Sequence, residues 1–412
     1  MGMKNKFKRD IGESGLSKGN KFMEVKPAIE TFAKIKVVGL GGSGGSAINR
    51  MISSKIKGVE FVVINTDAQA LHHNQATTKI QIGKTTTRGL GAGMDSELGR
   101  KAAEENQDEI YDNLKGSDMV FLTCGLGGGT GTGSAPVVAD IAKDVGALTV
   151  AVVTKPFSFE GEERKRIAES GLSQLIEKVD TIITIPNDRL LQIIDKKTSL
   201  LEAFSIVDDI LQQGVQGISE LITVPGLVNV DFADVKAIMQ NAGSALMGIG
   251  RGSGENRAVE AAKMAIESPL LEMSIEGAKG ILFTVTGGSN LGMYELNEAA
   301  KIITNSADPN AKIIFGSVID ENLKDEIKIT VIATGFGEKK AKKVKSELAT
   351  PFSREEKTSP AFAPVSRSAA QPVRDQRQFR ERVAKDDDLA PPPKTKEEEE
   401  LDIPAFIRKK MM

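Results

Sequence analysis

The chain is poor in the residues that anchor disulfide and metal sites. Its 412 residues include no tryptophan, one cysteine and two histidines. A single cysteine, Cys124, cannot form an internal disulfide, which is typical of a protein from a reducing compartment. The two histidines, His72 and His73, are adjacent and have no cysteine beside them, so they lack the spacing of a zinc motif. We therefore expect no metal site built from protein side chains.

Excess charge and long apolar stretches are also missing. The chain has 54 Lys and Arg residues against 56 Asp and Glu residues, a net charge of -2, which gives no electrostatic reason to expect a nucleic-acid partner. The longest apolar runs, such as Ala147–Val153, fall short of the roughly 18 residues that a membrane-spanning helix needs. The first residues have no apolar stretch typical of a secretory signal. We therefore expect a cytoplasmic protein without a transmembrane segment.

The distributions of glycine and proline divide the chain into segments of different composition. All 41 glycines lie at or before Gly337, whereas eight of the 15 prolines lie between Pro351 and Pro404. Residues 1–31 lack hydrophobic periodicity, which predicts a flexible N-terminal extension. Residues 338–396 have few large apolar residues and predict a disordered linker. Apolar character returns in residues 397–412, which predicts a short docking peptide at the end of that linker.

The intervening sequence predicts an α/β fold. Near-continuous apolar runs such as 35–39, 60–65, 118–124 and 148–154 alternate with helical patterns, as expected of a parallel sheet buried on both faces. This predicts a Rossmann-like, doubly wound parallel-sheet domain over residues 32–198. A long apolar helix is expected over 199–222. Three further strand patterns after residue 280 predict a smaller α+β domain over 223–337.

The first glycine-rich turn, within Ile35–Ala47, is typical of a phosphate-binding loop. It follows a predicted strand, and Gly39, Gly41 and Gly44 match the pattern G-x-G-x-x-G. Asp67 lies 23 residues after Gly44, where a Rossmann fold places the carboxylate that binds a ribose. These two features by themselves leave an NAD-dependent oxidoreductase open as an alternative.

Two more glycine loops favour a polyphosphate ligand over a dinucleotide. Cys124–Gly133 reads CGLGGGTGTG between a strand and a helix, and Gly89–Gly93 reads GLGAG before another helix. Runs of glycine expose successive backbone N–H groups that can surround a di- or triphosphate. Gly83-Lys84-Thr85 lacks the opening glycine of a P-loop, so ordinary P-loop chemistry is excluded.

The second loop carries a family resemblance. The segment GGGTGTG at Gly127–Gly133 occurs together with NTDAQAL, TKPFSFEGEER, TIPNDRLL and NVDFADV, which begin at residues 65, 154, 184 and 229. In this combination the chain closely resembles the bacterial FtsZ family of tubulin-like cell-division GTPases. The resemblance covers residues 35–337 and resumes at the C-terminal peptide. It implies a GTPase that polymerises head to tail into filaments of the division ring at midcell, with GTP or GDP and Mg²⁺ as ligands.

The resemblance also implies roles for individual positions. Phosphates would be bound by the first glycine loop, by the signature loop and, near the γ-phosphate, by the third loop. Glu160 and Arg164 would reach the ribose, and Asn187, Phe204 and Asp208 would surround the guanine. The predicted nucleotide-binding residues are Gly41, Gly42, Gly44, Gly45, Asp67, Ala92, Gly93, Gly127, Gly128, Gly129, Thr130, Gly131, Thr132, Gly133, Glu160, Arg164, Asn187, Phe204 and Asp208.

Hydrolysis is assigned by resemblance to Asp231 and Asp234, with Asn229 beside them. By themselves, two carboxylates at a predicted helix start are typical of helix caps. In the family such residues project onto the nucleotide of the adjacent subunit. Phosphoryl transfer depends chiefly on positioning and charge neutralisation, so orienting a water and holding a cation is work they can do.

The C-terminal segment Leu401–Lys410 resembles the family peptide that docks on membrane-tethering and regulatory division proteins. Elsewhere the chain departs from the family pattern: Ser43 and Ser46 stand where glycine and asparagine are common, and Met94-Asp95-Ser96 replaces a common Ala-Asn-Pro. A tubulin-like protein of plasmid partition remains a second alternative, although the division-type tail disfavours it.

Overall fold

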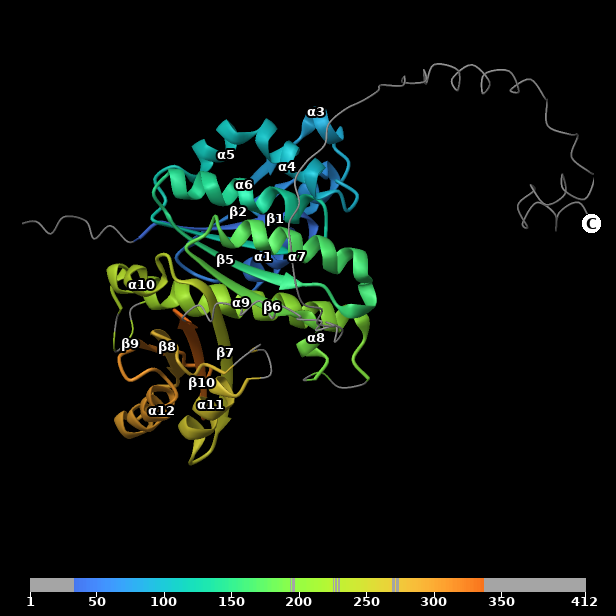
Figure 1. The fold of residues 1–412 in the computed structure, drawn as a ribbon. Helices are drawn as coiled ribbons and strands as arrows, with labels where there is room; N and C mark the ends of the chain where they lie inside the picture. The colour runs from blue at the N-terminus through green and yellow to red at the C-terminus, as the bar shows by residue number, and fades with distance from the viewer. Residues whose placement is uncertain are drawn as a thin grey trace, which may run out of the picture. The chain divides into compact units, whose positions relative to one another are not determined.

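The computed structural model describes residues 33–336 except positions 193, 195–196, 225, 227, 229, 269–270 and 272–273. The predicted extension, linker and docking peptide lie outside the described residues. The described part is a mixed α/β fold built on one ten-stranded sheet in the order β3-β2-β1-β4-β5-β6-β7-β10-β8-β9 (Figure 1). The strands are β1 Ile35–Leu40, β2 Val59–Asn65, β3 Thr78–Gln81, β4 Met119–Gly125, β5 Leu148–Lys155, β6 Thr181–Pro186, β7 Gly243–Ser253, β8 Gly280–Gly287, β9 Lys312–Ile319 and β10 Glu326–Thr334.

Helices connect most of these strands. They are α1 Gly41–Ser53, α2 Ala68–His73, α3 Lys84–Thr87, α4 Ser96–Glu105, α5 Gln107–Leu114, α6 Thr130–Asp144, the 3₁₀ turn η1 Ser158–Glu160, α7 Glu162–Ile176, α8 Asn187–Leu190, α9 Leu200–Thr223, α10 Phe232–Met239, α11 Arg257–Ile266 and α12 Met293–Asn305. None of the helices among the described residues is long and apolar enough to cross a bilayer.

The first six strands are parallel and follow the order of a Rossmann fold. β1 pairs with β2 on one side and with β4 on the other, so the chain direction across the sheet reverses between β1 and β4. Open α/β sheets bind ligands at the carboxyl ends of the strands beside such a reversal. The loops that follow β1 and β4 are the first glycine loop and the signature loop.

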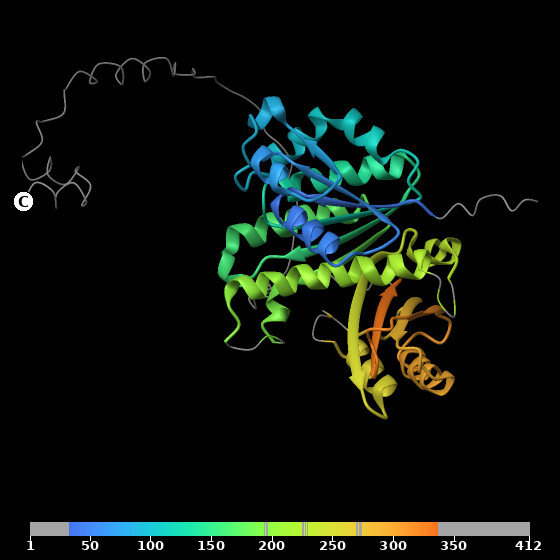
Figure 2. The same cartoon turned by 180° about the vertical axis from the view of Figure 1, so that it is seen from behind.

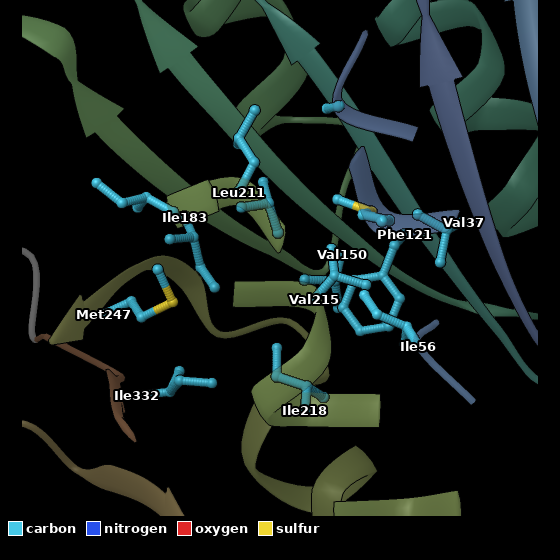
Figure 3. Close-up of a cluster of buried hydrophobic side chains, with 14 of the residues drawn as sticks. Val37, Ile56, Phe121, Val150, Ile183, Leu211, Val215, Ile218, Met247 and Ile332 are labelled. Atoms are coloured by element: carbon cyan, nitrogen blue, oxygen red, sulfur yellow. The ribbon is translucent and has the colours of Figure 1, made fainter. Parts of the chain in front are cut away.

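The long helix α9 packs against strands from both parts of the sheet, including β5 and β9. A Ser199–Glu202 capping box starts it, with the Glu202 carboxylate accepting the Ser199 N–H at 2.8 Å. Figure 2 shows α9 running between the strands β1–β6 and the strands β7–β10. Val215 and Ile218 lie in one buried cluster with Phe121 from β4 and Ile332 from β10 (Figure 3). Leu201, which the sequence suggested as part of the apolar cover, is instead 80% exposed.

β7 was not expected from the sequence, and it makes the sheet continuous. Its start pairs with β6 in parallel, and the rest pairs with β10 in antiparallel. The segment is glycine-rich, which is typical of a loop. Its glycines instead allow α11 to approach, since a Cβ at Gly248 or Gly250 would lie 1.9 Å from a backbone oxygen of that helix.

Candidate functional site

A cavity of about 420 Å³ opens at the carboxyl ends of the parallel strands. It is bounded by the loops after β1, β4, β5 and β6 and by the first half of α9. Twelve of the predicted nucleotide-binding residues line it: Gly42, Ala92, Gly93, Gly128, Gly129, Thr130, Gly131, Glu160, Arg164, Asn187, Phe204 and Asp208. The fold therefore gathers residues that are up to 166 positions apart in the chain (208 − 42) into one concave site.

Two helix N-termini converge on this cavity. α1 begins at Gly41 and α6 at Thr130, and neither helix has a side-chain cap or an acidic residue in its first turn. The first N–H groups of a helix have no partner within the helix, and its dipole favours an anion there. Gly42 of α1 and Gly131 of α6 both line the cavity, so uncapped donors from two helices are directed toward one place. This arrangement is suited to a polyphosphate.

The glycines of these loops serve two different purposes. A Cβ at Gly42 or Gly128 would meet nothing within 4 Å, so these residues leave open space in the cavity. A Cβ at Gly133 would lie 1.9 Å from the Ser96 oxygen, and one at Gly44 would lie 2.5 Å from the Thr123 oxygen. Gly133 and Gly44 are therefore required for close packing of α6 on α4 and of α1 on β4.

The third loop reaches the cavity through Ala92 and Gly93. It follows the short helix α3, unlike the first two glycine loops, which follow strands. The loop contains two non-glycine residues with left-handed backbone, Arg88 with φ 55° and Met94 with φ 69°. Its end is fixed by Asp95, which caps α4 by accepting the Leu98 N–H at 3.1 Å.

An aromatic ring and two polar side chains form the other end of the cavity. Phe204 is 40% exposed, and its ring meets the buried ring of Phe157 edge to face at 5.7 Å. One face of Phe204 is thus available to a planar ligand. Asn187 is buried, and its Oδ1 has no hydrogen-bond partner in the described part of the chain. An unpartnered buried acceptor in a cavity wall points to a ligand that donates to it.

Asp208 lies one turn after Phe204 on α9. Burial raises the pKa of Asp208 to about 6, with the positive charge of Arg50 opposing the rise and the negative charge of Asp209 adding to it. Arg50 itself pairs with Asp209 at 2.7 Å and donates to the Ser205 carbonyl, which ties α1 to α9. Asp208 has no ion pair among the described residues, and a half-buried carboxylate of this kind is stabilised by a ligand with N–H donors.

Glu160 and Arg164 form an ion pair at the cavity wall, with 2.5 Å between Arg164 Nη1 and Glu160 Oε2. The other oxygen of Glu160 accepts the Phe157 N–H at 2.9 Å. Glu160 therefore has a fixed position, and the half-exposed Arg164 supplies the one guanidinium in the cavity lining.

Residues 34–195 match the model of the tubulin/FtsZ family GTPase domain, and residues 243–337 match the FtsZ family C-terminal domain. An empty FtsZ dimer from M. jannaschii is 50% identical with a TM-score of 0.72, over 74% of this chain and 89% of that one. The chain belongs to the FtsZ family. A point mutant of FtsZ from M. jannaschii matches equally, over 74% of this chain and 92% of that one. The resemblance seen in the motifs is thereby confirmed, as are the tubulin-like α/β fold and the GTPase domain.

The same fold occurs in more distant proteins. CetZ2 from Haloferax volcanii, in a GTPγS-bound protofilament, is 20% identical with a TM-score of 0.64, over 74% of this chain and 94% of that one. CetZ1 from Haloferax volcanii, as a GDP-bound monomer, is 21% identical with a TM-score of 0.64.

Not every nucleotide-binding residue predicted for this FtsZ-family chain lines the cavity. Asp67 caps α2, with its Oδ1 accepting the N–H groups of Gln69 and Ala70, and it is not part of the cavity lining. Thr132 accepts the Gly127 N–H at 2.9 Å and thereby closes the signature loop on itself. The predicted residues outside the lining are Gly41, Gly44, Gly45, Asp67, Gly127, Thr132 and Gly133.

The cavity of this FtsZ-family chain also contains residues that were not predicted. Ser43 and Ser46 lie on the exposed side of the first turns of α1, Thr154 lies near the end of β5, and Pro156 follows that strand. The full set is Ser43, Ser46, Gly125, Leu126, Thr154, Pro156, Val207 and Leu211. Val207 and Leu211 follow Phe204 at helical spacing, which could have placed them on the same face of α9.

Asp231 and Asp234 lie far from this cavity in the FtsZ-family fold. Asp231 caps α10 by accepting the Ala233 N–H at 3.1 Å, and Asp234 follows in its first turn. The last residue of α10, Met239, accepts a hydrogen bond from Thr181 at the amino end of β6, whereas Asn187 follows the carboxyl end of that strand. Asp208 and the end of α9 at Thr223 are separated by about 22 Å of helix. Asn229 lies outside the described residues.

No cluster of three or more His, Cys, Asp or Glu side chains that could hold a metal ion occurs within the described residues of the FtsZ-family chain. Among the described lining residues, the carboxylates are Glu160, which is paired with Arg164, and Asp208, which lies beside Phe204. Any cation near the α1 and α6 N-termini would therefore take most of its ligands from the phosphates and from water.

Proposed function

We propose that this chain binds GTP in the cavity and hydrolyses it when copies assemble head to tail into filaments of the division ring. The observation that carries the proposal is the division of the functional residues between opposite edges of one sheet. The cavity lies at the carboxyl ends of β1, β4, β5 and β6, and Asp231 and Asp234 belong to a helix that ends at the amino end of β6. One subunit thus presents a nucleotide at one edge and the two carboxylates at the other.

The bound nucleotide would lie with its phosphates at the α1 and α6 N-termini and its base at Phe204. The uncapped N–H groups of the two helices replace the lysine that a P-loop would supply. Guanine carries the N1–H and N2–H donors that the Asp208 carboxylate and the unpartnered Asn187 oxygen can accept. Adenine has no donor at N1, so the same groups favour guanine. Arg164 and Glu160 lie between the two ends, where the ribose would lie.

Mg²⁺ would enter with the nucleotide. The lining provides no free pair of carboxylates for a protein-held ion, and Mg²⁺ is commonly bound through substrate phosphates and water. It would neutralise the charge that the β- and γ-phosphates carry into a site with one guanidinium.

Assembly follows from the geometry of the site. A contact that joins the Asp231–Asp234 edge of one copy to the cavity of the next is heterologous, and such contacts repeat without closing into an open filament. In that arrangement Asp231, Asp234 and Asn229 of one subunit reach the γ-phosphate held by its neighbour. Their task is to orient the attacking water and hold a cation, because an ordinary aspartate is a weak base.

Filaments of this kind would form the ring at midcell in the cytoplasm. Leu401–Lys410 would connect the filament to membrane-tethering and regulatory division proteins through Ile403, Pro404, Phe406 and Ile407, with the basic end adding attraction. The similar structures of an FtsZ dimer and of a CetZ2 protofilament support assembly as a property of this fold.

Two alternatives from the sequence are disfavoured. A dinucleotide site would use Asp67 for a ribose, but this carboxylate caps α2. A partition role would not explain the division-type C-terminal peptide, and deletion of residues 401–412 tests it: ring recruitment should be lost while GTPase activity is kept.

The deciding experiment is the GTPase rate as a function of protein concentration. The proposal expects almost no turnover below a threshold concentration and a linear rise above it, together with thermal stabilisation by GTP and none by NADH. A rate per subunit that is constant at all concentrations would contradict assembly-dependent hydrolysis. Stabilisation by NADH alone would contradict the assignment of the nucleotide.

A further inference from the structure

Ser43 joins the two phosphate-binding loops. It is the third residue of α1 and lines the cavity, and its hydroxyl oxygen accepts the Gly125 N–H at 2.8 Å from the end of β4. This hydrogen bond crosses from the first glycine loop to the signature loop. A glycine at this position could not make this bond, because it has no hydroxyl.

The proton of the Ser43 hydroxyl has no acceptor within the described structure. A serine hydroxyl has one proton to donate, and the Gly125 N–H already uses Oγ as an acceptor. Other serines of α1 use their protons within the helix: Ser46 donates to the Gly42 carbonyl at 3.2 Å and Ser53 donates to the Asn49 carbonyl at 2.9 Å. Among these three hydroxyls, Ser43 is the one with a proton left for a ligand.

The helix geometry directs that proton to the cavity. Side chains of an α-helix tilt toward its N-terminus, and the N-terminus of α1 opens onto the cavity beside Gly42 and Gly131. An anion that accepts the N–H groups of α1 would lie next to the Ser43 oxygen. The Ser43 side chain lies against Gly125, since its oxygen accepts the Gly125 N–H and a Cβ at Gly125 would lie 2.9 Å from that same oxygen.

We infer that Ser43 is a nucleotide-binding residue whose hydroxyl accepts the Gly125 N–H and donates to a phosphate oxygen of the bound nucleotide. The inference rests on the proposed function, since it requires the phosphates to lie at the α1 and α6 N-termini. The Gly125 N–H, the Ser43 hydroxyl and a phosphate oxygen would then form a continuous series of hydrogen bonds, which links the signature loop and the first glycine loop to the ligand. A donor to an anionic acceptor contributes more than a neutral hydrogen bond.

The test compares S43A and S43G with the wild-type chain, with S53A as a control from the same helix. Dissociation constants are measured for GTP, GDP and guanosine below the assembly threshold. For S43A we expect affinity for GTP and GDP to fall about tenfold while guanosine binding is unchanged, because guanosine has no phosphate. S43G uncovers the Gly125 N–H and should lose less affinity than S43A. S53A should bind all three ligands like the wild type.

Three results would overturn the inference. S43A could bind GTP and GDP like the wild type. S43A could lose affinity for guanosine to the same extent as for GTP. Finally, S43G could lose as much affinity for GTP and GDP as S43A. Thermal unfolding of each variant without ligand separates these results from a folding defect. Failure of the wild-type chain to bind GTP would instead contradict the proposed function itself.

Discussion

At the scale of single residues, Asp208 is the group whose charge depends most on what occupies the cavity. Burial raises its pKa to about 6 in the ligand-free chain. Guanine donors bind the charged form and would lower this pKa again. Binding of the base and loss of the proton are therefore linked, and the affinity must depend on pH in the range around the ligand-free value.

We predict that guanosine binds with constant affinity at pH values well above 6 and more weakly as the pH falls through about 6, approaching tenfold per pH unit. Guanosine is the right probe because it has no phosphate that titrates in this range. The measurement is its dissociation constant between about pH 7.5 and pH 5. D208N should bind weakly with little pH dependence, and an unchanged slope in D208N would contradict the role of this carboxyl.

The same substitution should stabilise the empty protein. Because the native carboxyl holds its proton more tightly than the unfolded one, the charged group opposes folding above pH 6, and this cost is relieved as the pH falls toward about 4. At neutral pH we expect D208N to raise the free energy of unfolding by about 1 kcal/mol, a value reduced for the partial exposure of the side chain. Denaturant unfolding at two pH values measures it. A less stable D208N at neutral pH would contradict the prediction.

The glycines of the signature loop give a paired prediction. G133A places a methyl group against the Ser96 oxygen between α4 and α6, so it should destabilise the fold by roughly 3 kcal/mol. G128A adds a methyl group in open cavity space and should change stability by less than about 1 kcal/mol while weakening GTP binding. Denaturation midpoints and GTP affinities of the two variants distinguish packing from ligand access. A lower stability of G128A than of G133A would contradict these two predictions.

At the scale of elements, the third loop is held in place by one carboxylate. Glu105 at the end of α4 accepts the backbone N–H and the hydroxyl of both Thr85 and Thr86, and these bonds lower its pKa to about 2. Asn106 accepts the Gly83 N–H at 3.0 Å beside it. The loop beyond includes Arg88 and Met94 in left-handed conformations, which such anchoring has to maintain.

We predict that E105Q weakens binding of GTP more than binding of GDP, so that the ratio of GTP affinity to GDP affinity falls several-fold. The amide of glutamine cannot accept all four donors, so the loop that carries Ala92 and Gly93 toward the γ-phosphate loses its fixed start. The matched control is E104Q, which removes an ion pair with Arg100 on the same helix. The affinity ratio of GTP to GDP is the measurement, and a ratio equal to that of E104Q would contradict the anchoring role.

Elements with strong apolar runs could be predicted from the sequence, and the elements that depend on tertiary packing could not. The runs that become β1, β4 and β5 are buried on both faces, so composition alone indicated them. β7 was missed because its glycines suggest a loop, and their reason lies in the approach of α11. Similarly, the signature motif predicted that Gly133 binds the ligand, whereas in the structure Gly133 lies against α4 and not in the cavity lining. Sequence spacing could not reveal this, because it does not show which neighbouring atoms lie next to a glycine Cα.

At the scale of the whole molecule, the cavity and α10 lie at different edges of the sheet, so the proposed function divides hydrolysis between two subunits. Two defective chains should then complement each other. D234A keeps an intact cavity but lacks one of the carboxylates that meet the neighbouring nucleotide, whereas D208N keeps both carboxylates but binds GTP poorly. Each variant alone should hydrolyse GTP very slowly.

In an equal mixture of the two variants, hydrolysis should reappear wherever D208N follows D234A in a filament, with the nucleotide of D234A facing the carboxylates of D208N. Random order along an open filament makes roughly a quarter of the contacts competent, so activity should approach that fraction of the wild-type rate above the assembly threshold. A mixture of D234A with E104Q-D234A, in which no subunit supplies the carboxylate, is the matched control and should stay inactive. If the D234A and D208N mixture is no more active than its components, each chain must contain its own complete site, and the assignment of hydrolysis to the subunit contact is wrong.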